Sequence, residues 1–151
     1  MFIAVALHVL AAVIWVGGMF FALLILRPAA GPFDPPQRLP LWGRVLDRFF
    51  PWVWGAVILL PVTGYWMIFD GFGGMGHLPV YLHIMQGIGW LMILLFLHMW
   101  FAPYRRLHRA IAAEDYAAAA AQLNQIRIFV TINLILGLII IAIGASGRYW
   151  G

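Results

Sequence analysis

The side chains in this sequence best suited to chemistry are its five histidines: His8, His77, His83, His98 and His108. His8 and His83 each fall inside a long apolar stretch, where an ionisable side chain is costly and usually functional. A neutral imidazole offers one ring nitrogen to a metal ion or a haem iron. The absence of cysteine excludes thiolate metal sites and disulfides, and a single serine disfavours serine-nucleophile chemistry. We therefore expect a bound cofactor, a metal or a transported species to carry the chemistry.

The two histidines inside apolar stretches are predicted to lie at similar depths. At 1.5 Å per residue, His8 lies about 9 Å below the start of its helix and His83 about 5 Å below the start of its own. The first and third helices of a four-helix bundle are diagonal partners. Small residues lie about one turn away on the same faces, Ala4 and Ala11 beside His8 and Gly87 beside His83. These faces are predicted to point inward and favour one b-type haem between His8 and His83, or close helix packing.

Further residues are candidates for the same site. Trp15 and Trp90 lie on the His8 and His83 faces of their helices. Arg148 is expected at the same depth, where its guanidinium could pair with haem propionates or anchor the chain at the interface. His98 is expected to face inward near the other end of the third span, where no second histidine is available, so a second haem is disfavoured. His108 lies among three arginines and is expected to be solvated.

Copper is the alternative metal. Copper(I) favours thiolate, thioether and imidazole ligands, so without cysteine it would need methionine and histidine. Met75 and His77 lie together in the second connection, and His8 and His83 would complete the ligand set. The seven methionines include no Met-x-x-x-Met pair that would share a helix face. The residues alone leave haem b and copper both open.

The composition requires that membrane helices position these residues. The 151 residues are 65% hydrophobic and 9% charged, whereas a typical soluble domain is about 45–50% apolar and about 25% charged. Lipid must therefore cover most of the folded surface, and a soluble enzyme is excluded. The net charge of +4 comes from arginines placed as a membrane protein places them, so nucleic acid is not an expected partner.

Four apolar stretches are long enough to span a membrane. Crossing a hydrocarbon core of about 30 Å takes about 20 helical residues, and the stretches cover residues 2–26, 49–69, 80–102 and 126–146. They predict an all-α integral membrane four-helix bundle of up-down-up-down topology, forming a single domain over residues 1–151. A short interfacial helix is expected at Leu39–Phe50.

Two motifs resemble the CopD (copper resistance protein D) family of small bacterial inner-membrane proteins. The motif in the first span is His8-x6-Trp15-x-Gly17-Gly18-x-Phe20. The motif in the fourth span comprises Arg127-Ile128, Ile132-Asn133-Leu134 and Leu136-Gly137, and it is followed by Gly147-Arg148-Tyr149 near the C-terminus. The resemblance extends over essentially the whole chain and implies copper uptake or tolerance. Wider relatives include HemJ-like protoporphyrinogen oxidases, which implies haem b bound through the first-helix histidine, here His8. Their pattern also uses a lysine in a later span, and this chain has none.

The sequence thus predicts a b-type haem protein that transfers electrons and is a possible oxidoreductase. Its partners would be the lipid bilayer and either a quinol or a periplasmic electron acceptor. The alternatives are CopD-like copper transport or tolerance, and a small structural subunit that needs no ligand.

The arginines predict the orientation in the bacterial inner membrane. Eight of the nine lie in the first and third connections or at the mouth of the fourth span: Arg27, Arg38, Arg44, Arg48, Arg105, Arg106, Arg109 and Arg127. Because arginine is enriched in cytoplasmic segments, both termini are expected to be periplasmic.

A reporter fused after Gly151 tests this orientation. We expect a periplasmic reporter to be active at that position and a cytoplasmic reporter to be silent. The opposite pattern of activities would show that the bundle is inverted.

Overall fold

The computed structural model describes residues 1–150, and every regular element in that range is a helix. The first rod consists of α1 (Phe2–Phe21), the π-helical turn η1 (Ala22–Leu26) and α2 (Arg27–Ala30). The second rod is α3 (Pro35–Phe72), which is followed by a short 3-10 turn, η2 (Met75–His77). The third rod consists of α4 (Val80–Met99), the π-helical turn η3 (Trp100–Tyr104) and α5 (Arg105–Ala112). The fourth is α6 (Tyr116–Ser146), which ends in the 3-10 turn η4 (Gly147–Tyr149).

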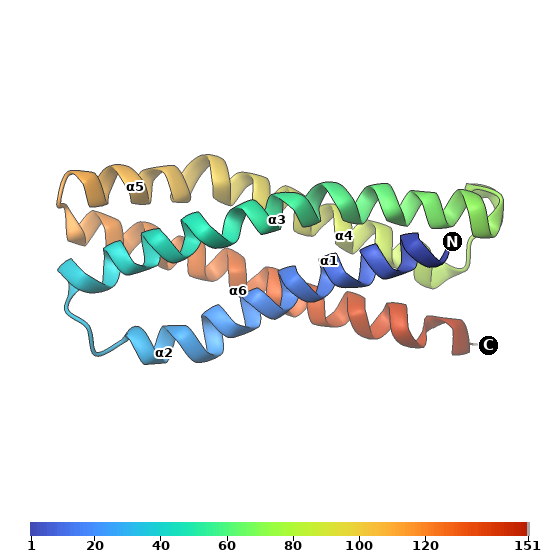
Figure 1. Cartoon of the computed structure of the whole chain (residues 1–151), viewed down its shortest axis with the longest axis horizontal. Helices are drawn as coiled ribbons and strands as arrows, with labels where there is room; N and C mark the ends of the chain where they lie inside the picture. Colours follow the sequence, from blue (N-terminus) through green and yellow to red (C-terminus); the bar gives the residue numbers. More distant parts are fainter. Residues whose placement is uncertain (151) are drawn as a thin grey trace.

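Within residues 1–150, these four rods are long and apolar enough to cross a membrane. This confirms the predicted all-α four-helix membrane bundle. Both termini and the turn between α3 and α4 lie at one end of the bundle, hereafter the terminal end (Figure 1). The other end, hereafter the arginine end, holds the connection between α2 and α3 and the connection between α5 and α6 (Figure 1).

The helix predicted at Leu39–Phe50 is present, but it is not a short element of its own, because α3 runs without a break from Pro35 and includes Pro40 and Pro51. Each proline leaves the carbonyl four residues before it without a helical N–H partner. Those carbonyls belong to Pro36 and Asp47, which are both exposed at the arginine end. Water can therefore satisfy them, and the helix continues.

Prolines also accompany both π-helical turns. Pro28 directly follows η1 and Pro103 lies within η3. A proline cannot donate to the carbonyl one turn earlier, and a π turn shifts the hydrogen bonds to a five-residue spacing. The Arg27 N–H accordingly bonds to the Ala22 carbonyl. The first and third rods thus remain continuous to the arginine end.

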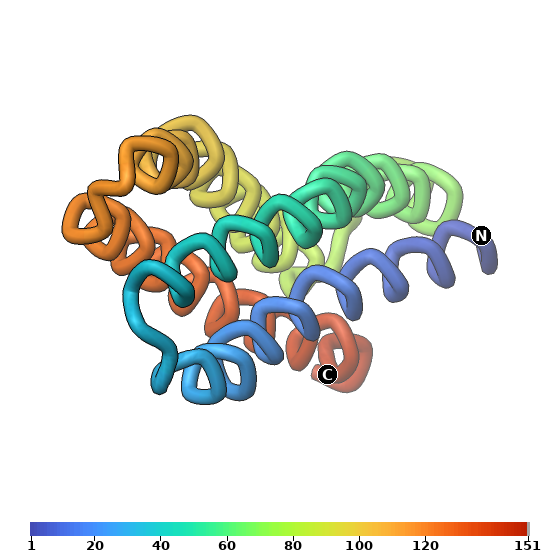
Figure 2. The backbone as a smooth tube through the Cα atoms, turned by 60° about the vertical axis from the view of Figure 1, so that its left-hand side comes forward, coloured from blue at the N-terminus to red at the C-terminus, as the bar shows by residue number. Residues whose placement is uncertain are grey.

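The rods pack as two pairs that are joined through the first helix. α1 packs mainly on α3 and α4 packs mainly on α6, while α1 also contacts α6. The backbone trace shows α1 running between α3 and α6 (Figure 2). The two pairs meet at an aromatic core, in which Phe50 and Phe96 pack edge to face with ring centroids 5.6 Å apart.

A buried amide joins α6 to α4. The Asn133 side chain is 1% exposed and donates from Nδ2 to the Met92 carbonyl at 3.1 Å. Four residues later Gly137 brings α6 close to α1, because a Cβ at this position would lie 2.7 Å from Val16 Cγ2. Small residues at a membrane helix interface permit this close approach.

The Gly137→Ala variant tests this packing. The added methyl would displace Val16, a β-branched residue with little rotamer freedom, so we expect a loss of about 1–3 kcal/mol of stability. The matched control is Gly55→Ala, because a Cβ there meets nothing within 4 Å. Thermal unfolding in detergent measures both variants, and equal melting temperatures would show that Gly137 is not a packing constraint.

Candidate functional site

The candidate site is built around His8, which α1 directs toward α3. The His8 Nδ1 lies 2.8 Å from the Thr63 hydroxyl oxygen. Ala4 and Ala11, one turn away on either side of His8, are 0% and 5% exposed. On α3, a Cβ at Gly64 would lie 3.4 Å from His8 Cε1, so the glycine leaves space for the ring. Small residues on both helices therefore allow a histidine between them.

The hydrogen bonds of Thr63 favour one position for the proton of His8. A hydroxyl has one proton to donate, and the Thr63 hydroxyl donates it to the Leu59 carbonyl at 2.7 Å. With that proton on the Leu59 carbonyl, the Thr63 oxygen accepts from the imidazole and the proton of neutral His8 is on Nδ1, whereas a Thr63 proton directed at Nδ1 would place the His8 proton on Nε2. The Nδ1 tautomer leaves the lone pair on Nε2 available to a metal ion. Histidines that bind metals usually have this arrangement, with the second nitrogen held by a hydrogen bond that fixes the ring.

The face of α4 that carries His83 lies outside the core. The sequence predicts that His83, Gly87 and Trp90 point inward, but all three are exposed. The reason is that α4 buries other residues against α6 and the aromatic core: Met92, Ile93, Phe96 and Met99.

One polar contact nevertheless connects this face to α3. The indole N–H of Trp90 donates to the Tyr65 hydroxyl at 3.1 Å. A Cβ at Gly87 would meet nothing within 4 Å, so the space beside His83 is open. Trp15, the other tryptophan predicted at the site, is 3% exposed and packs edge to face on Phe96 with centroids 6.3 Å apart.

The remaining predicted site residues lie at the terminal end. Met75 and His77 belong to the single turn η2 and are both exposed. The Arg148 guanidinium donates to the neighbouring Tyr149 hydroxyl and lies 4.6 Å above that ring. Within residues 1–150, no three histidine, cysteine, aspartate or glutamate side chains gather to hold a metal ion. The terminal end therefore offers separate imidazole and thioether donors, with His8 the most buried of its histidines.

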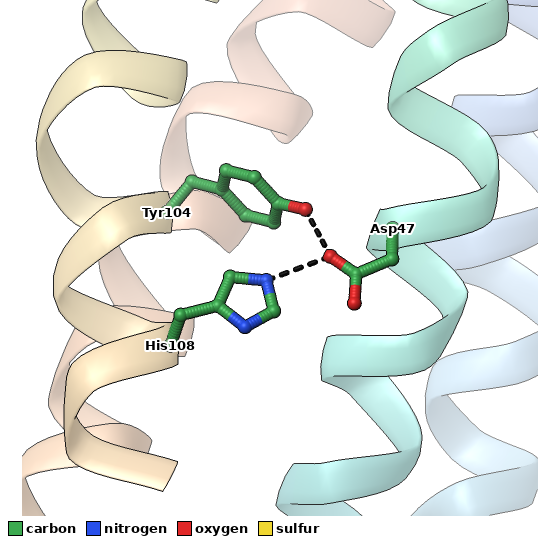
Figure 3. Close-up of polar contacts among 3 residues, drawn as sticks. All are labelled: Asp47, Tyr104 and His108. Atoms are coloured by element: carbon green, nitrogen blue, oxygen red, sulfur yellow. Dashed lines mark hydrogen bonds and ion pairs between the residues drawn. The ribbon is translucent and has the colours of Figure 1, made fainter. Parts of the chain in front are cut away.

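A second polar cluster lies toward the arginine end. Asp47 on α3 accepts two hydrogen bonds at one carboxylate oxygen, from the Tyr104 hydroxyl and from His108 Nε2 at 2.7 Å (Figure 3). His108, which was expected to be solvated, lies on α5 and also faces Asp47. Its side chain stays 41% exposed, so this pair joins two helices in contact with solvent. His98 is also exposed rather than inward-facing and packs on Phe129 of α6.

Four residues that make these polar contacts were not predicted from the sequence: Thr63, Tyr65, Asp47 and Tyr104. Thr63 is a hydroxyl residue within the second apolar stretch, and its polarity there was an available signal. Its pairing with His8 was not available, because 55 residues separate the two. The pairing depends on the packing of α1 against α3.

Comparison with known proteins gives one match. The family model described as "CopD: Copper resistance protein D" matches residues 43–146. The matched region includes His77 and His83, and it begins after the helix that carries His8. No curated protein and no solved structure matches the chain.

Substitutions at Thr63 test the hydrogen bond to His8. Thr63→Val keeps the shape but leaves the imidazole N–H without an acceptor, which is expected to cost roughly 1 kcal/mol. Thr63→Ser keeps the hydroxyl and serves as the control. Thermal unfolding should therefore separate the two variants, and identical unfolding would show that the hydroxyl does not hold His8.

Proposed function

The chain belongs to the CopD family, and we propose that it handles copper in the membrane, in uptake or tolerance, with His8 as a copper ligand. The observation that supports this role is the contact between His8 Nδ1 and the Thr63 hydroxyl, which favours the tautomer with an unprotonated Nε2. The ring is fixed through Nδ1 by Thr63, so its lone pair is available without breaking an existing hydrogen bond. An imidazole held in this way is a preorganised donor for copper.

Copper(I) suits the donors at the terminal end. Copper(I) prefers imidazole and thioether ligands where thiolates are absent, and this chain has no cysteine. Met75, His77 and His83 are exposed at this end, whereas His8 is more buried. We propose that the exposed donors capture the ion and that His8 receives it deeper in the bundle.

Separate donors suit an ion that passes through the protein as cargo. Transport requires binding that is favourable enough for entry and weak enough for release. A closed cage of three or four ligands would retain the ion, and the described residues contain no such cluster of histidine, cysteine or acidic side chains. Transient binding at His8 therefore fits a protein that moves copper across the membrane better than a protein that stores copper.

A single b-type haem is the second candidate. It is favoured by the Nδ1 tautomer of His8, which leaves Nε2 unprotonated, and by the exposed surface at Gly87, where a cofactor beside His83 would meet no side chain. His8 and His83 would hold the haem, which would supply electron transfer with a quinol or a periplasmic acceptor. The chain's own contribution would be the fixed orientation of the His8 ring.

Copper uptake into proteoliposomes tests the proposal with His8→Asn. The asparagine amide can still donate to Thr63 but has no equivalent of Nε2, so we expect the bundle to fold. Loss of a ligand should lower uptake by roughly 10–100-fold, the range found when metal sites lose supporting groups. His98→Asn is the matched control, because that residue is exposed and packs on Phe129. Uptake by the folded His8→Asn protein at the wild-type rate would refute the role of His8.

An absorption spectrum of the purified protein decides between the two candidates. The copper proposal predicts no Soret band. A Soret band that shifts on reduction, and that is lost in both His8→Ala and His83→Ala, would instead establish the haem candidate.

A further inference from the structure

A cavity of about 690 Å³ opens toward the arginine end, between the first rod, α3 and α6. Three guanidinium groups line it, from Arg27, Arg38 and Arg127. Most of the other lining residues are apolar, including Leu23, Leu39, Trp42, Phe49, Phe50 and Val130. Figure 1 and Figure 2 show α2 set apart from the start of α6, with the start of α3 between them.

Within residues 1–150, no side chain that lines this cavity supplies a counter-charge to its arginines. No acidic residue lines the cavity. Within the described residues, Arg27 and Arg127 make no ion pair or side-chain hydrogen bond, and Arg38 donates only to the Phe33 carbonyl at 3.1 Å. Guanidinium groups gathered at a membrane interface in this way attract an anion.

An adjoining groove extends from Arg27 and Arg127 along the exposed apolar surface. It has a volume of about 610 Å³ and shares Leu23, Leu24, Arg27 and Arg127 with the cavity. Its floor continues along α6 through Ile128, Thr131, Ile132, Leu134 and Ile135. From Arg127 to Ile135 the helix rises about 12 Å, which takes the groove well into the hydrocarbon layer.

We propose that this cavity and groove bind one anionic phospholipid. Its phosphate lies between Arg27 and Arg127, within reach of Arg38, and an acyl chain lies along Ile128, Ile132 and Ile135. The site is separate from the copper donors, because these residues belong to the arginine end and His8 lies near the terminal end. The proposal therefore does not depend on the proposed function.

The two parts of the site together favour a lipid over other anions. Free phosphate would use the arginines but would leave the apolar groove without a ligand. A zwitterionic lipid carries its own cation, which partly neutralises its phosphate and competes with the arginines. An anionic lipid such as phosphatidylglycerol supplies a net negative charge and an acyl chain in the places where the structure has arginines and isoleucines.

Thermal unfolding in detergent, with added phosphatidylglycerol, phosphatidylcholine or inorganic phosphate, tests the proposal. The wild type should be stabilised by phosphatidylglycerol, clearly less by phosphatidylcholine and not by inorganic phosphate. The double variant Arg27→Gln/Arg127→Gln should bind phosphatidylglycerol roughly tenfold or more weakly, because each arginine near the surface contributes to anionic lipid binding. The control is Arg105→Gln/Arg106→Gln, which removes two arginines of α5 that do not line the cavity or the groove.

A second pair of variants keeps the charge and changes the groove. In Ile132→Trp the indole fills the groove that would hold the acyl chain. Ile139→Trp places the same side chain at an exposed position of α6 outside the groove. Only Ile132→Trp should lose the phosphatidylglycerol shift. Equal shifts with both lipids in the wild type would overturn the proposal, as would an unaltered shift in the arginine double variant. Stabilisation by inorganic phosphate alone would identify an anion site and also refute the lipid.

Discussion

An imidazole inside a membrane bundle needs a polar partner, and the hydrogen bond between His8 and Thr63 provides one. In lipid, no water replaces a missing acceptor, so the ring N–H must be paired within the protein. Thr63 can accept because its own proton is already donated to the Leu59 carbonyl of the same helix. The proposed copper chemistry depends on this one contact, because a proton held on Nδ1 leaves Nε2 unprotonated. The contact in turn requires α1 to pack closely on α3, which Ala4, Ala11 and Gly64 allow.

The first rod connects two ends of different chemistry. Near the terminal end it carries His8, and the neighbouring connection supplies the soft donors Met75 and His77. At the arginine end it carries Arg27, beyond the π-helical turn η1. An imidazole with an unprotonated nitrogen suits a soft metal ion, whereas unpaired guanidinium groups suit a lipid phosphate. We propose that the anionic lipid holds the arginine end at the interface while the terminal end exchanges copper.

The helices and the burial of the His8 face could be predicted from the sequence, because both depend on local pattern. Apolar length defines the spans, and Ala4 and Ala11 identify the face of α1 that packs closely. The orientation of α4 could not be predicted in the same way. Its residues are apolar around the whole helix, so their periodicity does not distinguish a face toward lipid from a face toward protein. Tertiary packing buried Met92 and Phe96 and left His83 exposed.

The hydrogen-bond partners of the polar residues also could not be predicted from the sequence. Thr63 and Asp47 meet residues 55 and 61 positions away, and only the packing of the rods brings them together. The continuity of α3 through Pro40, Pro51 and Pro61 was not predictable from local rules either, because proline removes a helical hydrogen bond and usually kinks or ends a helix. Local rules therefore predicted the elements, while the site depends on contacts between helices.

The protonation and metal binding of His8 are measured most directly by nitrogen-15 NMR of histidine-labelled protein in lipid bilayers. The His8 signals are assigned by their loss in His8→Asn. In metal-free protein we expect the proton on Nδ1 and an unprotonated Nε2, and we expect the Nε2 resonance to shift when copper(I) is added. A proton on Nε2 in the metal-free protein, or an Nε2 resonance unchanged at saturating copper(I), would contradict the role of His8 as a copper ligand.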